Sequence, residues 1–186
     1  FEGAENLLSN TGGLKSEGVD FEMIYSLPLH FGVFGANSGK LSFRVAGTRL
    51  IRYDLNPVAA IPELTQRCAG RFGVYCGDPY SKLRLNNRIT WSSGPITLGM
   101  THRYLSSVRD DDDTTTYSVE KIKAYNLFDL GLQVQATETF GWSLGMNNMF
   151  NKKPPIMGDN QQQSNTYPST YDVYGRAFFV NASVKF

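Results

Sequence analysis

The chain has 186 residues, of which 18 are Lys or Arg and 17 are Asp or Glu, and 41% are hydrophobic. A net charge of +1 produces no field that could hold a polyanion, so nucleic acid is excluded as a default partner. The longest stretches without charge or His span 13 residues, whereas a membrane-spanning helix needs about 20 mostly apolar residues. The sequence therefore predicts no spanning helix, and its length suits one domain at most.

Apolar and polar residues alternate along most of the chain, which predicts β-strands. The alternation lapses at Arg49 and Leu50, where we expect a β-bulge, and again at Asn87. One side of each strand is apolar, and the other side carries most of the Asp, Glu and Arg residues of the strands. Seven strands are expected, near residues 19–27, 41–53, 83–91, 96–104, 128–134, 140–146 and 178–186.

The connections between these strands differ in length in a regular way. Residues 92–95 and 136–138 form tight turns, and residues 28–39 form a connection of moderate length. The long connections, 54–79, 107–121 and 148–171, all fall on the other side and hold most of the turn-forming residues. Short turns on one side and long loops on the other are typical of an outer-membrane β-barrel, whose long loops face outside.

Strand length and aromatic placement favour the same class. Most of the strands could run nine or more residues, the length that a tilted membrane strand needs, whereas globular strands average about 5 to 6 residues. Tyr25, Tyr53, Trp91, Tyr104 and Trp142 lie toward strand ends with the apolar set, as expected at a lipid–water boundary. A soluble β-sandwich, with the apolar sides forming its core, is the alternative that periodicity leaves open.

Cys68 and Cys76 are separated by seven residues with no His nearby, which does not match the spacing of zinc sites. Both lie in a polar, turn-rich segment. We therefore expect a disulfide in an oxidising compartment, with two free buried thiols as the alternative. No cofactor or metal is predicted.

Several segments resemble one family. Residues 145–155 resemble the Gly-x-x-Asn-Leu-Phe-Asp run and following Pro pair near the end of TonB-dependent outer-membrane receptors, with departures at Met149 and Asn151. Residues 165–168 and 171–176 resemble the family's last loop and its entry into the closing strand. Residues 18–22 and 86–91 resemble other strands of its barrel, so the similarity covers nearly the whole chain.

The resemblance implies an all-β, antiparallel transmembrane β-barrel of 22 strands, of which residues 1–186 would be the C-terminal portion and about the last seven strands. The family's plug domain and earlier strands have no counterpart here. Seven strands cannot close into a barrel of at least about 8, so we expect a fragment of a longer polypeptide or a piece of a nicked molecule.

The family also implies partners and a location. These are the bacterial outer membrane and its lipid, the TonB protein acting through the missing plug, and the outer-membrane assembly machinery. That machinery would recognise the final strand, through Phe178, Val180, Val184 and Phe186.

Two groups of side chains are candidates for ligand contact. Arginines of the polar side would face the barrel lumen, where they either hydrogen-bond a plug or one another, or line a substrate route, since an Arg cluster can hold carboxylates or other anions. These are Arg44, Arg52, Arg84, Arg88 and Arg103. Aromatic residues of the long connections either stack on a sugar or catechol or pack the loops together. These are Phe72, Tyr75, Tyr80, Tyr117 and Tyr167.

The remaining polar residues point to no chemistry. Asp110 to Asp113 form an acidic run, which we interpret as a solvated loop tip, with calcium binding as the alternative. His30 falls in a turn and His102 in a strand, so a site that they share is not expected. The sequence contains no nucleophile elbow and no HExxH motif, so we expect no enzyme.

The expected function is a part of an energy-coupled importer of a scarce nutrient, such as a ferric siderophore, a vitamin or an oligosaccharide. Outer loops would capture the ligand. The alternatives are a structural or adhesive outer-membrane barrel and a soluble β-sandwich binding module.

Overall fold

The computed structural model describes residues 12–159 and 161–185, and the regular elements in this part of the chain are β-strands apart from one short 3-10 helix. Seven long strands form one antiparallel sheet in the order β1-β2-β5-β6-β9-β10-β11, and β3 pairs with β2. The long strands are β1 (Gly13–Leu29), β2 (Gly39–Asn56), β5 (Leu83–Ser93), β6 (Ile96–Leu105), β9 (Tyr125–Gln135), β10 (Phe140–Asn147) and β11 (Ala177–Val184). The short elements are η1 (Pro62–Leu64), β3 (Gln66–Arg67), β4 (Arg71–Phe72), β7 (Val108–Asp110) and β8 (Lys121–Ile122).

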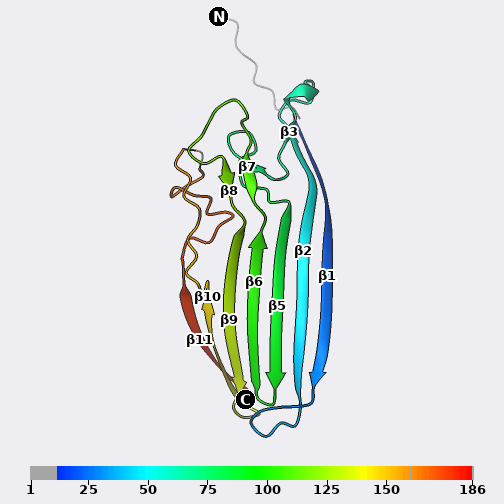
Figure 1. Cartoon of the computed structure of the whole chain (residues 1–186), viewed down its shortest axis with the longest axis vertical. Coiled ribbons are helices and arrows are strands. Elements are labelled where there is room, and N and C mark those ends of the chain that lie inside the picture. The colour runs from blue at the N-terminus through cyan, green and yellow to red at the C-terminus, as the bar shows by residue number, and fades with distance from the viewer. Residues whose placement is uncertain (1–11, 160, 186) are drawn as a thin grey trace, which may run out of the picture.

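The strands lie side by side in one curved layer, with the long connections gathered at one end and the short turns at the other (Figure 1). We call the three long connections, residues 57–82, 106–124 and 148–176, the loop cap. The expected seven long strands and the alternation of loop lengths are both confirmed. The sheet stays open, because β1 and β11 stand at its two edges.

The strand register separates two faces. Residues that pair across neighbouring strands share a face, so a row of pairs can be followed across the whole sheet. One row runs from Tyr25 through Phe43, Ile89, Met100, Leu130 and Met146 to Phe178, and defines the apolar face. The opposite side, the polar face, carries Asp20, Glu22, Arg44, Thr48, Arg84, Arg88, Arg103 and Asp129.

The expected β-bulge lies in β2. Glu17 pairs with Arg52 and Gly18 with Leu50, so Ile51 is the additional residue. The pairing of β1 shows no other irregularity, and one inserted residue reverses the alternation of β2 beyond it. Arg52 therefore lies with Glu17 on the side of the apolar face, which differs from the expectation that it shares a face with Arg44.

The hydrophobic core is not in the sheet. Met23 and Val180 of the apolar face are 61% and 77% exposed, and no second layer covers that face in the described part of the chain. The buried cluster lies at the cap end, and comprises Phe72, Val108, Ile122, Tyr125, Leu127, Met157, Tyr167 and Tyr171. A β-sandwich would bury the apolar face instead, so the structure does not support that alternative.

Residues 12–159 and 161–185 include no helix that is long and apolar enough to cross a membrane.

Candidate functional site

The loop cap is held by its own core. Each of its three connections contributes buried side chains, and Tyr125 and Leu127 of β9 close the cluster from below. The rings of Phe72 and Tyr167 meet edge-on with centroids 5.8 Å apart, although 95 residues separate them in the chain. Burying one such side chain stabilises by about 1.5–3 kcal/mol. The three connections are therefore expected to fold as one unit.

Two of the aromatic candidates for ligand contact belong to this core. Phe72 is 0% exposed and Tyr167 is 3% exposed, so the interpretation that they pack the loops together describes both. Burial of the Tyr167 phenol, with the nearby carboxylate of Asp110 as a second cause, raises its pKa to about 12.

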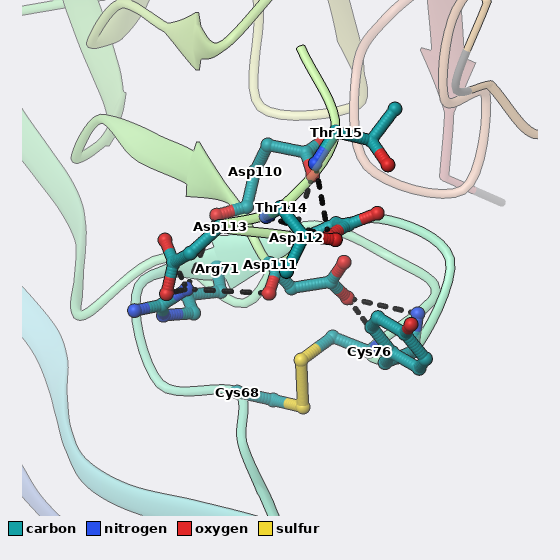
Figure 2. A network of polar contacts seen from close by, with 10 residues as sticks. Cys68, Arg71, Cys76, Asp110, Asp111, Asp112, Asp113, Thr114 and Thr115 are labelled. Carbon is teal, nitrogen blue, oxygen red and sulfur yellow. Dashed lines mark hydrogen bonds and ion pairs between the residues drawn. A yellow bond between two sulfur atoms is a disulfide. The ribbon is translucent and has the colours of Figure 1, made fainter. Parts of the chain in front are cut away.

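A disulfide closes a short loop within the first connection, and a carboxylate of the second connection binds that loop (Figure 2). Cys68 and Cys76 form the disulfide expected from the sequence. The Asp111 carboxylate accepts hydrogen bonds from the backbone N–H groups of Cys76 and of Tyr75, the latter at 3.0 Å. Burial raises the pKa of Asp111 above its ordinary value, and the backbone N–H of Cys76 opposes that shift. The disulfide loop and the acidic run are thus tied to each other.

Arg71 strengthens the same junction. Its strand β4 pairs in parallel with β7, and its guanidinium lies 3.3 Å from the Asp113 carboxylate. The guanidinium also donates to the carbonyl oxygens of Asp110 and Asp111, each at 3.4 Å. The cation therefore balances part of the charge that the acidic run brings into the cap.

The acidic run differs from the expected solvated tip. Asp110 and Asp111 are buried, and only Asp112 and Asp113 form the outer tip. Asp112 accepts from the Thr114 hydroxyl at 2.6 Å and from the Thr114 N–H at 2.9 Å, which lowers its pKa to about 2. In the part of the chain that the structure describes, no group of three or more His, Cys, Asp or Glu residues is placed to hold a metal ion.

A buried asparagine begins the third connection. Asn148 is fully buried with a positive φ of 50°, and its side chain bonds the backbone of Lys152 in both directions, at 2.7 and 2.9 Å. Its N–H donates to Asp129 at 2.8 Å, and Asp129 is held by Arg103 at 2.9 Å. Sequence reasoning quoted Asn148 only within a family motif. The structure shows that it fixes the direction in which this loop leaves β10.

Four of the five arginines predicted to face the lumen, all but Arg52, form a band on the polar face. Arg44 pairs in register with Arg88, and Thr48 with Arg84, so these side chains share that face with Arg103. Arg44 forms an ion pair with Glu22, whereas Arg84 and Arg88 have no carboxylate partner among the described residues. A hollow of about 610 Å³ lies here between Asp20, Glu22, Thr48, Arg84 and Arg103. Its use as a substrate route stays a prediction.

The other aromatic candidates differ in exposure. Tyr75 is 54% exposed and borders a mostly apolar hollow of about 500 Å³, lined also by Leu55, Leu64 and Val74. The Tyr117 hydroxyl donates to Asp112 at 3.3 Å, and the Tyr80 ring stacks on Tyr53 with centroids 4.0 Å apart. Tyr75 is therefore the candidate whose ring is most open to a ligand.

The proposed assembly residues lie at the last strand. Phe178, Val180 and Val184 project from β11 on the apolar face and are exposed, whereas Phe186 lies outside the described residues. The two histidines are not brought together. His30 follows β1 at the end away from the cap, and His102 lies in β6 between Asn87 and Asn126, at 3.1 and 2.8 Å.

Comparison with protein families tests these observations. Residues 2–149 match the family model described as TonB dependent receptor-like, beta-barrel. The chain belongs to this family. The family indicated by the motifs and the predicted fold class are both confirmed. Members of this family are outer-membrane receptors and transporters. No curated protein matches the sequence in a direct search.

The sheet also resembles part of a solved structure. A mutant ferric enterobactin receptor from Pseudomonas aeruginosa is 16% identical with a TM-score of 0.55, over 92% of this chain and 22% of that chain. A second mutant of that receptor is 14% identical with a TM-score of 0.46, over 90% of this chain and 31% of that chain. The first likeness shows the fold, and the chain spans less than a quarter of the length of that receptor.

Proposed function

We propose that this chain is the C-terminal portion of the barrel of a TonB-dependent receptor, one that imports a scarce nutrient across the bacterial outer membrane. A plug domain and earlier strands from the rest of the polypeptide would complete the barrel. The TonB protein would act on that plug and supply the energy. The chain itself performs no chemistry in this proposal, since its part is to form the wall and to present the loops.

The observation that carries the proposal is the single sheet with two unlike faces. No residue of the row from Tyr25 to Phe178 on its apolar face is buried, and Tyr25, Ile89 and Phe178 are exposed, which suits contact with lipid. The polar face carries the arginine band and suits a wet lumen. The loop cap at one end then corresponds to the outside of the cell, because long loops of such barrels are extracellular.

We further propose an anionic ferric siderophore as the nutrient. Arg84 and Arg88 have no carboxylate partner among the described residues, and guanidinium groups bind oxyanions through paired hydrogen bonds. The exposed ring of Tyr75 beside an apolar hollow suits an aromatic part of such a chelate. The first structural relative is named for ferric enterobactin, which agrees with this class.

The test is uptake by cells. A strain that lacks the whole receptor is complemented with the wild type, with Arg84→Gln/Arg88→Gln, or with Lys121→Gln/Lys123→Gln as a matched loss of two cap cations. Radioiron uptake is then measured for a panel of catecholate, carboxylate and neutral siderophores, and labelled vitamin and oligosaccharide uptake in parallel. We expect uptake of an anionic siderophore that falls at least tenfold in the first variant alone. Uptake of none of these compounds, at normal receptor levels in the outer membrane, would contradict the importer and favour a structural barrel.

A further inference from the structure

Arg103 of β6 is linked to both ends of the third connection. Its guanidinium donates two hydrogen bonds to the Asp129 carboxylate, at 2.9 and 3.2 Å. Asp129 also accepts from the N–H of Asn148, where the connection begins, at 2.8 Å. The Nη2 atom of Arg103 lies 3.8 Å from the carboxylate of Asp172, near the other end of the connection. One guanidinium on the polar face therefore contacts the supports of both loop ends.

The two contacts of Arg103 differ in strength. Two parallel hydrogen bonds to one carboxylate are the strong and specific arrangement of an Arg–carboxylate pair, and Asp129 forms it. The contact with Asp172 is a single distance of 3.8 Å, beyond the range of a hydrogen bond. Solvent screens it, because the side chains of Arg103 and Asp172 are 41% and 23% exposed. The contact with Asp172 is therefore the one that Arg103 can lose first.

Asp172 also orders the last turn of the third connection. One of its carboxylate oxygens faces Arg103, and the other accepts from the N–H of Tyr174 at 3.1 Å. A displacement of the Asp172 side chain therefore breaks the hydrogen bond of the Tyr174 amide. Exchange of that amide with solvent reports directly on the position of the carboxylate.

The Tyr125 hydroxyl offers the Asp172 carboxylate a second partner. This hydroxyl is buried and has no hydrogen-bond partner among the described residues, which is costly for a polar group. The Tyr125 ring meets the ring of Tyr171, the neighbour of Asp172, edge-on with centroids 5.1 Å apart. The charges of Asp172 and Arg103 both act on the hydroxyl. A carboxylate that leaves Arg103 can therefore accept from Tyr125 instead.

Arg103 also borders the hollow of about 610 Å³ on the polar face, together with Arg84. Its side chain is partly exposed, so a solute in the hollow can reach the guanidinium. A carboxylate or another oxyanion there uses the same N–H donors as Asp172 does. An anion between Arg84 and Arg103 therefore competes with Asp172, whereas an uncharged solute does not.

We propose that an oxyanion bound between Arg84 and Arg103 displaces Asp172 onto the Tyr125 hydroxyl and thereby releases the end of the third connection. The inference rests on the proposed function for the entry of an anion into the lumen, and it adds a regulation of that site. The loop cap is then loosened from the lumen side. Because such coupling is reciprocal, release of Asp172 strengthens anion binding by the same factor.

The test uses the complete receptor, purified in a mild detergent, with citrate without iron as the probe. Hydrogen exchange of residues 171–176 is followed by mass spectrometry without additive, with citrate, with chloride at equal ionic strength and with glucose. Citrate affinity is measured in parallel by calorimetry. The variants are Asp172→Asn, Tyr125→Phe and Arg84→Gln. Asp159→Asn is the matched control, since that carboxylate of the same connection accepts from Ser118 at 2.6 Å.

We expect citrate to accelerate the exchange of residues 171–176 about threefold in the wild type, because a partly exposed ion pair is weak. Chloride and glucose should leave the exchange unchanged. Asp172→Asn removes the competition, so it should lose the response and bind citrate about threefold more tightly. Tyr125→Phe removes the second partner and should reduce the response, whereas Asp159→Asn should keep it. Arg84→Gln should weaken citrate binding.

An exchange rate that citrate leaves unchanged in the wild type overturns the coupling, as does an equal effect of chloride or a full response in Asp172→Asn. Absence of citrate binding, or binding that Arg84→Gln leaves unchanged, overturns the competition at Arg103. A full response in Tyr125→Phe overturns the transfer to its hydroxyl. Radioiron uptake by cells with the wild-type receptor reports separately on the importer, so failure of the coupling and failure of the proposed function are distinguishable.

Discussion

The sheet and the loop cap differ in where their apolar side chains lie. The sheet leaves one apolar face open along its length, whereas the cap closes the eight buried residues of its cluster into a core like that of a small soluble domain. The difference follows from the solvent that each part meets. An apolar face can remain exposed to lipid without a free-energy cost, but a loop in water must bury its apolar groups against one another.

The charged residues differ in the same way. On the polar face of the sheet, carboxylates meet arginines across strands and stay partly exposed, as Glu22 and Arg44 do. In the cap, Asp111 is buried and accepts from backbone N–H groups, so its charge orders a loop. A given substitution should therefore act differently in the two regions, and the following experiments use this contrast.

The largest effect is expected from Phe72→Ala in the complete receptor. Removing a fully buried ring from the cap core leaves a cavity and should destabilise the cap by about 3–5 kcal/mol. Hydrogen exchange of residues 57–82, 106–124 and 148–176 measures the change. The matched truncation Val180→Ala, on the open apolar face, should change stability by no more than about 0.5 kcal/mol. Equal effects of the two variants would show that the cap has no separate core.

The next effect concerns the sheet. Met100 lies on the apolar face between Ile89 and Leu130, and Met100→Arg places a charge toward lipid at a cost of about 2–4 kcal/mol. Its neighbour Thr101 faces the other side, so Thr101→Arg should assemble and refold nearly as the wild type does. Urea titration of the refolded receptor in lipid vesicles provides the measurement. Comparable losses in both variants would contradict the assignment of the faces.

A smaller effect is expected from the disulfide. Cys68→Ser/Cys76→Ser releases a short loop with a sequence separation of 8, which the chain-entropy relation values at roughly 2–3 kcal/mol. Limited proteolysis should then cut residues 68–76 faster and leave the strands intact. Reductant should reproduce this in the wild type and add nothing in the variant. An unchanged cleavage rate would mean that Asp111 alone holds the loop.

The smallest effect is a pH dependence at the loop tip. Hydrogen bonds from Thr114 lower the pKa of Asp112 from 3.8 to about 2. The Asp112 carboxylate is therefore protonated at a lower pH in the folded tip than in the unfolded tip. The stabilisation is complete above the higher pKa and is lost as the pH falls through the lower one. The hydrogen exchange of the Thr114 and Thr115 amides, normalised to the intrinsic rate at each pH, should therefore become faster as the pH falls from 4 to 2. Asp112→Asn should remove this dependence, and a wild-type profile that stays flat would refute the assignment.

Particular residues show where sequence reasoning succeeded. The alternation around Phe43, Ile89 and Met100 identifies strands and their apolar side, because a side chain's direction in a strand depends on its immediate neighbours. The lapse at Arg49 and Leu50 correctly indicated a bulge. Its exact position, and with it the side on which Arg52 lies, followed only from pairing with β1. The same holds for Asp111, whose burial depends on a loop 35 residues away.

The order of apolar and polar residues predicted seven strands and the ends at which their connections lie. The polar, turn-rich segment around Cys68 and Cys76 favoured a disulfide, and short motifs indicated the family. Each of these depends on neighbours in the chain. Tertiary structure alone decided that Phe72 and Tyr167 join one core, that Asp111 anchors the disulfide loop, and that Arg52 turns outward. Contacts between distant segments set these outcomes, and no local pattern records which distant partner a side chain will meet.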